Sequence, residues 1–305
     1  MALFKIENNE RLENIKELPF KLEKEIQSLT EKNLESIFGL QFVESEFSLN
    51  NFRIDTLGFD KDARSFVILE FKKDKNFSVI DQGYAYLSLM LNNKADFILE
   101  YNENSKVALK RDDIDWSQSK VIFISPSFTT YQKEAINFKD LPIELWEIKR
   151  YNNQTVSYAQ VRTSGARESI KTISRQDEVI DKVTKEIKVY SEDEHLERGS
   201  QEIKELYESL KTTILSIDEF EIKPKKKYIA FVSGTNVVDI HIQKNALKIW
   251  LNLPYGELED PRKLSRDVSS IGHWGNGDYE VIMKPDDDLD YILGLIKQSL
   301  KKNKK

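Results

Sequence analysis

Two short apolar segments that contain three charged residues constrain this chain more than any other feature. They are residues 53–58 (RIDTLG) and 67–72 (VILEFK), separated by an acidic turn. Their length, their β-branched residues and the turn between them predict a β-hairpin whose strands are mostly buried. Because side chains repeat every two residues along a strand, Glu70 and Lys72 lie on the same face. Pairing of the two strands brings Asp55 to that face as well.

Two carboxylates and one ammonium group are costly on a buried face. They must neutralise one another or bind a metal ion. One interpretation is an ordinary cross-strand salt bridge. The other is a divalent-metal site, because Mg²⁺ prefers a few carboxylates together with waters and phosphate oxygens. A lysine beside the ion orients or deprotonates an attacking water. In this interpretation Asp55 and Glu70 are metal ligands, and Lys72 serves phosphodiester hydrolysis.

Asp55 followed by Glu70-Phe71-Lys72 resembles the D…ExK signature of the PD-(D/E)xK nuclease superfamily. Residues 79–87 predict a helix, on which Gln82 and Tyr86 are four residues apart and share one face. They resemble the QxxxY element of the RecB-like branch. A bacterial family of predicted nucleases, sometimes labelled "predicted transport protein", carries an uncharacterised C-terminal domain. The segments that resemble it are 26–27, 31–35, 45–47, 272–275 and 279–281.

The resemblance implies an α/β N-terminal domain with a restriction-endonuclease-like αβββαβ core and a mixed central sheet. It implies a Mg²⁺- or Mn²⁺-dependent DNA endonuclease, in a repair, restriction or phage-defence context. An RNA substrate stays open. Superfamily members often add an acid from the first helix, for which Glu23 is the first choice and Glu31 the competitor. The expected catalytic set is therefore Glu23, Asp55, Glu70, Lys72, Gln82 and Tyr86, with Asp55 and Glu70 as metal ligands.

Composition limits the remaining function classes. A length of 305 residues predicts two domains. Cysteine is absent, which excludes disulfides and thiolate metal sites. The sequence shows neither a signal peptide nor the roughly 18 apolar residues of a membrane helix, so we expect a cytoplasmic protein without a membrane partner. The net charge of −6 is unusual for a nucleic-acid enzyme. Local positive charge would come from lysines 72, 73, 75 and 94.

Hydrophobic periodicity and turn residues predict the order of elements in the first domain, residues 1–165. After an irregular or β-like lead-in up to about Glu17, a helix over 22–38 stops at Gly39. Strands are expected over 42–47, 52–59, 65–71, 95–101 and 120–125, and helices over 79–91 and 130–138. An edge hairpin is expected from strands 143–151 and 155–161.

Residues 166–199 are predicted to form a charged linker with one surface helix, and His195 is expected at the surface. Residues 200–305 predict a small α+β domain in which Ser200 caps the first helix. It contains the hairpin 237–253, a strand at 279–283 and a final helix from about Asp287. Its expected role is recognition of substrate, a partner protein or a second copy, which leaves a homodimer open. The alternative function for the whole chain is a non-catalytic interaction module on a nuclease fold.

Overall fold

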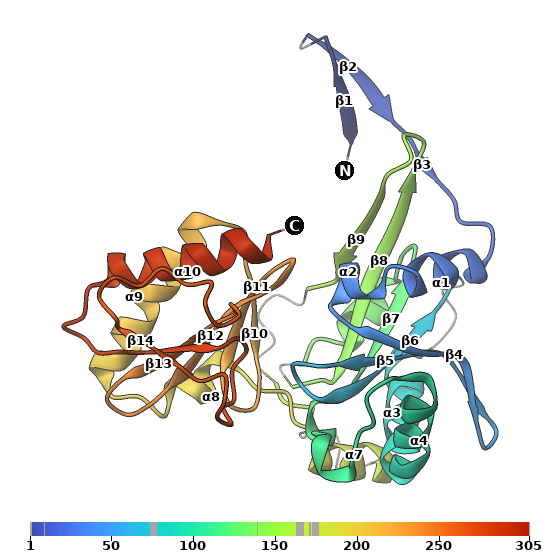
Figure 1. The fold of residues 1–305 in the computed structure, drawn as a ribbon. Helices are drawn as coiled ribbons and strands as arrows, with labels where there is room; N and C mark the ends of the chain where they lie inside the picture. Colours follow the sequence, from blue (N-terminus) through green and yellow to red (C-terminus); the bar gives the residue numbers. More distant parts are fainter. Residues whose placement is uncertain are drawn as a thin grey trace. The chain divides into compact units, whose positions relative to one another are not determined.

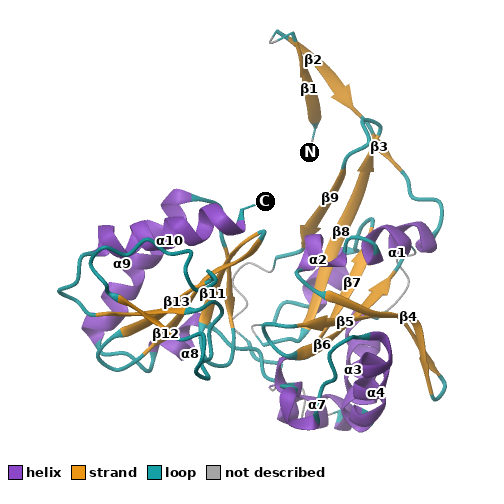
Figure 2. Ribbon diagram, viewed as in Figure 1, coloured by secondary structure: helices purple, strands orange, loops and turns teal. Residues whose placement is uncertain are grey.

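The computed structural model describes residues 2–304 except residues 9, 74–77, 139, 163–167, 171 and 173–176. The chain divides into two compact units, Met1–Val189 and Tyr190–Lys305 (Figure 1). Each unit combines strands with helices, as the colours of Figure 2 show. In the part of the chain that the structure describes, every helix is too short or too polar to cross a membrane.

A mixed sheet forms the centre of the first unit. Its strand order is β3-β8-β7-β6-β5-β4, and β9 pairs with β8. β7 runs parallel to both of its neighbours, β6 and β8. The remaining pairs of neighbouring strands are antiparallel. The strands are β3 (Glu17–Leu18), β4 (Gln41–Leu49), β5 (Phe52–Asp60), β6 (Ser65–Phe71), β7 (Lys120–Ser125), β8 (Ile143–Tyr151) and β9 (Val156–Gln160). The unit is therefore an α/β structure with a mixed sheet.

Helices cover this sheet (Figure 1). They are α1 (Glu23–Glu31), α2 (Leu34–Phe38), α3 (Val79–Asn92), α4 (Lys94–Asn104), α5 (Thr130–Ala135) and α7 (Glu178–Glu186), with 3₁₀ turns η1 (Arg111–Asp113) and η2 (Trp116–Gln118). On β6, Val67 and Leu69 join a core cluster with α1 and α2, while Phe66 and Ile68 join one with α3 and α4. All of β6 is buried, so any charged residue on it is removed from water.

The close packing of α3 on the sheet depends on a glycine. A Cβ added at Gly83 would lie 2.4 Å from Cδ1 of Ile143 on β8. The absence of a side chain lets the helix approach the sheet closely. This approach matters because Gln82 precedes the glycine directly and Tyr86 follows it by one turn. The glycine thus sets how near these two side chains come to β6.

The strand predicted at 95–101 is wrong, because these residues lie in α4. Phe97 and Tyr101 are spaced by four residues and are both buried, whereas Leu99 between them is exposed. Four-residue spacing is helical, and the apolar run concealed it. The strand that follows the α3–α4 pair is β7. The helix predicted over 22–38 is also interrupted, since α1 ends at Glu31 and α2 begins at Leu34.

The structure bears out the other predicted elements of the first unit within a few residues. Gly39 ends α2 with φ of 69°, and its N–H donates to the Glu35 carbonyl at 2.9 Å. An additional hairpin precedes the sheet, formed by β1 (Leu3–Glu7) and β2 (Arg11–Ile15) as a separate two-stranded sheet. This hairpin accounts for the predicted β-like lead-in.

The segment predicted as a charged linker divides between the two units. Its first helix, α7, is a surface helix that packs one side on the first unit, because Ile180, Val183 and Ile187 are buried in the core cluster that contains α3 while its other side is exposed. Its last part forms α8 (Glu192–Leu196) in the second unit. Most of the residues between 163 and 176 lie outside the described residues.

The second unit is an antiparallel sheet with helices. The strand order is β10-β11-β12-β13-β15-β14. Core residues of α9 and α10 pack on one face of it (Figure 1). Ser200 caps α9 by accepting from the Ile203 N–H, as predicted. The elements are α9 (Gln201–Ile217), β10 (Glu221–Pro224), β11 (Ile229–Ser233), β12 (Thr235–Ile242), β13 (Leu247–Leu251), β14 (Ser265–Asp267), β15 (Tyr279–Met283) and α10 (Leu289–Asn303).

The prediction that His195 lies at the surface is wrong. Its side chain is fully buried, and its Nε2 lies 2.7 Å from the Lys225 carbonyl oxygen. Of the acidic neighbours that suggested exposure, only Asp193 is exposed, whereas Glu192 and Glu194 are half-buried and Glu192 accepts from Tyr207 Oη at 2.6 Å. Burial lowers the pKa of His195 below its usual value of 6.5.

We predict that His195 stays neutral in the folded protein at pH values where a free histidine is charged. Because the folded pKa is lowered, the unfolded chain takes up the proton first, so stability decreases as the pH falls below about 6.5. An NMR titration of the ring C–H resonances should give His195 a midpoint below 6.5. A midpoint at or above that value would contradict the buried neutral assignment.

Candidate active site

Asp55, Glu70 and Lys72 come together where β5 pairs with β6. The pairing places Thr56 opposite Leu69, so Asp55 and Glu70 are the next pair along the two strands. There the backbone pairing gives way to a side chain, since Phe71 N–H donates to Asp55 Oδ2 at 2.9 Å. Lys72 follows the end of β6 directly. The face shared by these residues is the one predicted from strand periodicity.

Glu70 lies at the centre of this cluster and is only 3% exposed. Its Oε1 accepts from Lys72 Nζ at 2.6 Å and from Gln82 Nε2 at 3.0 Å. Its Oε2 is buried and has no hydrogen-bond partner among the described residues. A buried carboxylate oxygen without a donor is unfavourable. The geometry therefore leaves a position at Oε2 suited to a positively charged ligand.

The pKa of Asp55 shows that negative charge is in excess in this cluster. Burial and then the charge of Glu70 raise the pKa of Asp55 to about 6, although the Phe71 N–H and Lys72 act in the opposite direction. One ammonium group thus does not balance the two carboxylates in this environment. The ion pair of Lys72 with Glu70 runs along one strand, and the charge of Lys72 also acts on Asp55 across the strands.

Gln82 and Tyr86 reach the cluster from α3. Gln82 Nε2 donates to Glu70 and also lies 3.2 Å from Tyr86 Oη. The hydroxyl of Tyr86 in turn donates to the Arg53 carbonyl at 3.4 Å. Burial, followed by the charge of Glu70, raises the pKa of Tyr86, so its hydroxyl stays protonated. Tyr86 also belongs to the core, and it therefore packs the helix and contacts the site.

The two acids proposed from the first helix have different surroundings. Glu23 is exposed, and its Oε1 accepts from the backbone N–H of Lys73, the residue after Lys72. Glu31 instead joins α1 to β4 and β5 through one oxygen. That oxygen accepts from three side chains, Gln27 at 2.9 Å, Ser45 at 2.8 Å and Thr56 at 2.6 Å. Glu23 lies beside the end of β6, whereas Glu31 is part of a structural network.

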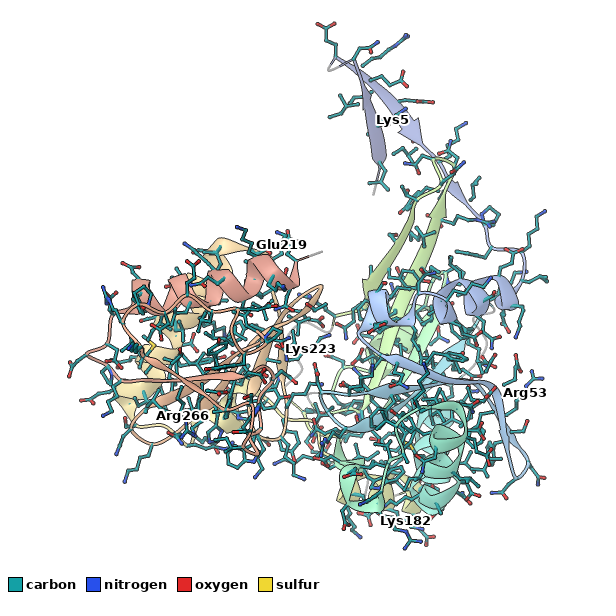
Figure 3. All side chains as sticks on the ribbon, in the orientation of Figure 1. Lys5, Arg53, Lys182, Glu219, Lys223 and Arg266 are labelled. Atoms are coloured by element: carbon teal, nitrogen blue, oxygen red, sulfur yellow. The ribbon has the colours of Figure 1, made fainter. Side chains whose placement is uncertain are left out.

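Sequence reasoning missed Glu46 on β4. The pairs Ser45–Thr56 and Phe47–Ile54 place it opposite Asp55, and its charge contributes to the raised pKa of Asp55. Glu46 has a φ of 58°, unusual for a residue other than glycine. It forms ion pairs with Lys24 at 2.9 Å and Arg53 at 2.8 Å; the position of Arg53 is labelled in Figure 3. Finding it would have required the register of β4 against β5.

The residues present fit a divalent ion held mainly by substrate and water. Within the described ranges of the chain, no group of three or more His, Asp or Glu side chains is arranged to hold a metal. Asp55 and Glu70 provide two carboxylates, and the second of them contributes the buried Oε2 described above. Mg²⁺ binds in this way, through one or two carboxylates together with waters and phosphate oxygens. The predicted Lys75 lies outside the described residues.

Comparisons with known proteins place the chain in a family. A protein of Haemophilus influenzae strain Rd, described as an uncharacterized protein, is 52% identical over 292 residues, covering 95% of this chain and 97% of that protein. The two proteins belong to one family. A family model for a domain of unknown function (DUF5655) matches residues 192–303 of the chain, inside the second unit.

Three solved structures show limited similarity. A structure of an EndoMS–dsDNA2 complex has a TM-score of 0.28, with 20% identity over 43% of this chain and 47% of that chain. A repair endonuclease from Pyrococcus abyssi has a TM-score of 0.25, with 17% identity over 48% of this chain and 64% of that chain. EndoMS in apo form has a TM-score of 0.25. This chain spans less than two thirds of each of them, and scores this low do not establish a shared fold.

The different surroundings of the two helix acids give a stability prediction. Glu31→Ala leaves the hydroxyl of fully buried Thr56 and two other donors without their acceptor. We expect a loss of about 2 kcal/mol in the free energy of unfolding. The exposed control Glu23→Ala should change it by less than about 0.5 kcal/mol. Urea unfolding followed by circular dichroism measures both, and equal losses for the two variants would contradict the assignment.

Proposed function

We propose that the chain is a divalent-metal-dependent nuclease that hydrolyses phosphodiester bonds in DNA. The observation that carries the proposal is the buried Oε2 of Glu70, which no donor in the described part of the chain reaches, beside a second carboxylate and a lysine. Neither packing nor the ion pair with Lys72 explains why this oxygen is buried without a donor. A cation shared with a phosphate group does account for it.

The order of elements supports a restriction-endonuclease-like core for the first unit. The pair α1–α2 precedes three antiparallel strands, β4, β5 and β6, after which α3–α4 leads to the parallel strand β7. This is the αβββαβ order with each helix divided in two. The site lies at the pairing of the second and third of these strands, as the PD-(D/E)xK resemblance implies. We infer that Asp55, Glu70 and Lys72 are the signature residues.

Each side chain has a role that follows from its contacts. A divalent ion held by Asp55 and Glu70 supplies charge stabilisation at the phosphate. Lys72, held 2.6 Å from Glu70, presents its ammonium protons to the attacking water and orients it for in-line displacement. Gln82 holds the same oxygen of Glu70 from the other side. The second oxygen of Glu70 is thereby kept turned away from both donors.

Two further residues act at the edge of this arrangement. Tyr86, a neutral hydroxyl, positions Gln82 and offers a contact for a phosphate oxygen. Glu23 holds the backbone of Lys73 at 2.7 Å, which fixes the chain directly after Lys72. We therefore assign Glu23 to the site as the acid of the first helix.

We predict metal-dependent cleavage of DNA that depends on both strand residues. Wild-type protein with Mg²⁺ or Mn²⁺ should cut labelled single-stranded, duplex or branched DNA, and Glu70→Ala and Lys72→Ala should each reduce the rate by about 100-fold or more. The exposed control Lys32→Ala should cut at the wild-type rate. Labelled RNA of the same sequence tests the other nucleic acid.

Cleavage that persists equally in all variants would identify a contaminating nuclease and contradict the proposal. Binding of DNA by the wild type with no cleavage under any metal would replace it with the non-catalytic interaction module.

A further inference from the structure

The sheet of the second unit has one face that the two long helices leave uncovered. On β12, Val238, Ile240 and Ile242 face the core formed with α9 and α10. The alternating residues Asp239 and His241 therefore face the other way. The same alternation on the neighbouring strands brings further aromatic and charged side chains to this second face. We call it the aromatic–basic face, and define it as Lys227, His241, Lys248, Trp250, Arg266, His273 and Trp274.

A tightly held loop, residues 272–277, lies over this face. Asp239 is fully buried, and its Oδ2 accepts from the N–H of Asn276 at 2.6 Å and from its Nδ2 at 3.0 Å. At Gly275 a Cβ would lie 2.5 Å from ring atoms of Trp250. The loop thus presses against a buried tryptophan and is anchored by a buried carboxylate. It presents its side chains in a fixed position.

Trp274, at the centre of this loop, is 52% exposed. Lys227 Nζ lies 4.8 Å from its ring centroid, and the ring of His241 meets it edge-on at 5.0 Å. A large aromatic side chain held half in water by a rigid loop buries little apolar area for its size. Packing within the unit does not explain its position. A planar ligand stacked on the ring does explain it.

Two buried ring nitrogens on the same face lack a hydrogen-bond partner in the described parts of the chain. They are Nε1 of Trp250, whose side chain is 1% exposed, and Nδ1 of His273. The two rings stack with centroids 6.4 Å apart. Buried polar atoms are normally satisfied. Because Trp250 is almost wholly covered, it supports the face from below, and the ring that a ligand can reach is that of the half-exposed Trp274.

The charges of the face are mainly positive. Lys248 and Arg266 share a single carboxylate, Glu280, at distances of 3.1 and 2.8 Å. The two cations and the one carboxylate together leave a net charge of +1. Lys227 adds another charge over the ring of Trp274 and comes directly after Lys225 and Lys226 in the sequence. The acid Asp239 is committed to the loop. Positive charge beside an exposed aromatic ring suits a ligand that carries both phosphates and flat rings.

We propose that the aromatic–basic face binds single-stranded nucleic acid, with a base stacked on Trp274 and the backbone phosphates near Lys227. Bases in a duplex are stacked on one another, so the ring of Trp274 reaches a base plane only in an unpaired strand. An acidic peptide without aromatic residues would meet the lysines but has no ring to stack on the tryptophan. The proposal goes beyond the hydrolytic site and requires neither Asp55 nor Glu70.

The test is binding of a fluorescein-labelled 12-nucleotide DNA or RNA strand to the full chain, measured by fluorescence anisotropy in EDTA so that no hydrolysis occurs. Wild type should bind, and Trp274→Ala and Lys227→Ala should each weaken binding by about 10-fold or more. The control Tyr255→Ala removes an exposed aromatic that stacks on Tyr279. It should change the affinity by less than about 2-fold. Trp274→Phe should restore part of the affinity.

Three results would overturn the proposal. They are no binding by the wild type, equal binding by wild type and Trp274→Ala, and binding of duplex as tight as that of the single strand. Competition by polyglutamate as effective as that by unlabelled strand would instead indicate an acidic protein partner. Circular dichroism of each variant shows that it is folded. Because the assay contains no metal, loss of binding here and loss of cleavage at Glu70 are separate outcomes.

Discussion

The arrangement of the first unit depends on one unfavourable placement, a carboxylate on a strand that is buried along its whole length. β6 lies in the middle of the sheet with helices on both faces, and Glu70 points toward α3. Lys72 and Gln82 satisfy one of its oxygens, and no other described residue donates to the second. The close approach of α3 at Gly83 brings Gln82 within reach. The proposed requirement for a cation follows from this arrangement.

Most of the sheet could be predicted from the sequence, because its strands are short apolar runs bounded by turn residues. The failure at 95–101 has a physical cause. Phe97 and Tyr101 face the core at helical spacing, but the residues between them are apolar enough to resemble a strand. The prediction that His195 lies at the surface failed for a related reason. Its neighbour Asp193 lies on the exposed side of α8, whereas the histidine itself lies on the inner side. In both segments the neighbours in sequence differ from the neighbours in space.

The candidate site shows the same limit. Strand periodicity was enough to bring Glu70 and Lys72 together, and helical spacing was enough for Gln82 and Tyr86. Periodicity does not distinguish Glu23 from Glu31, since both lie on α1. The difference lies in their partners: Glu31 accepts from three side chains that come from two strands and its own helix. Glu46 required the register of β4 against β5, which includes a shift near Phe42. The sequence alone does not reveal such a shift.

The most direct test of the account is thermal unfolding of the full chain in EDTA and in Mn²⁺, compared with Asp55→Asn and Glu70→Gln. If the two carboxylates lack a cation, Asp55→Asn is more stable than wild type in EDTA at pH 7.5, because burial and the charge of Glu70 raise the pKa of Asp55 and its ionised form is therefore unfavourable in the folded protein. Mn²⁺ at about 100 times its Kd should stabilise the wild type by about 2.7 kcal/mol and leave both variants unchanged. An Asp55→Asn variant less stable than wild type in EDTA, together with an equal effect of Mn²⁺ on all three proteins, would contradict the account.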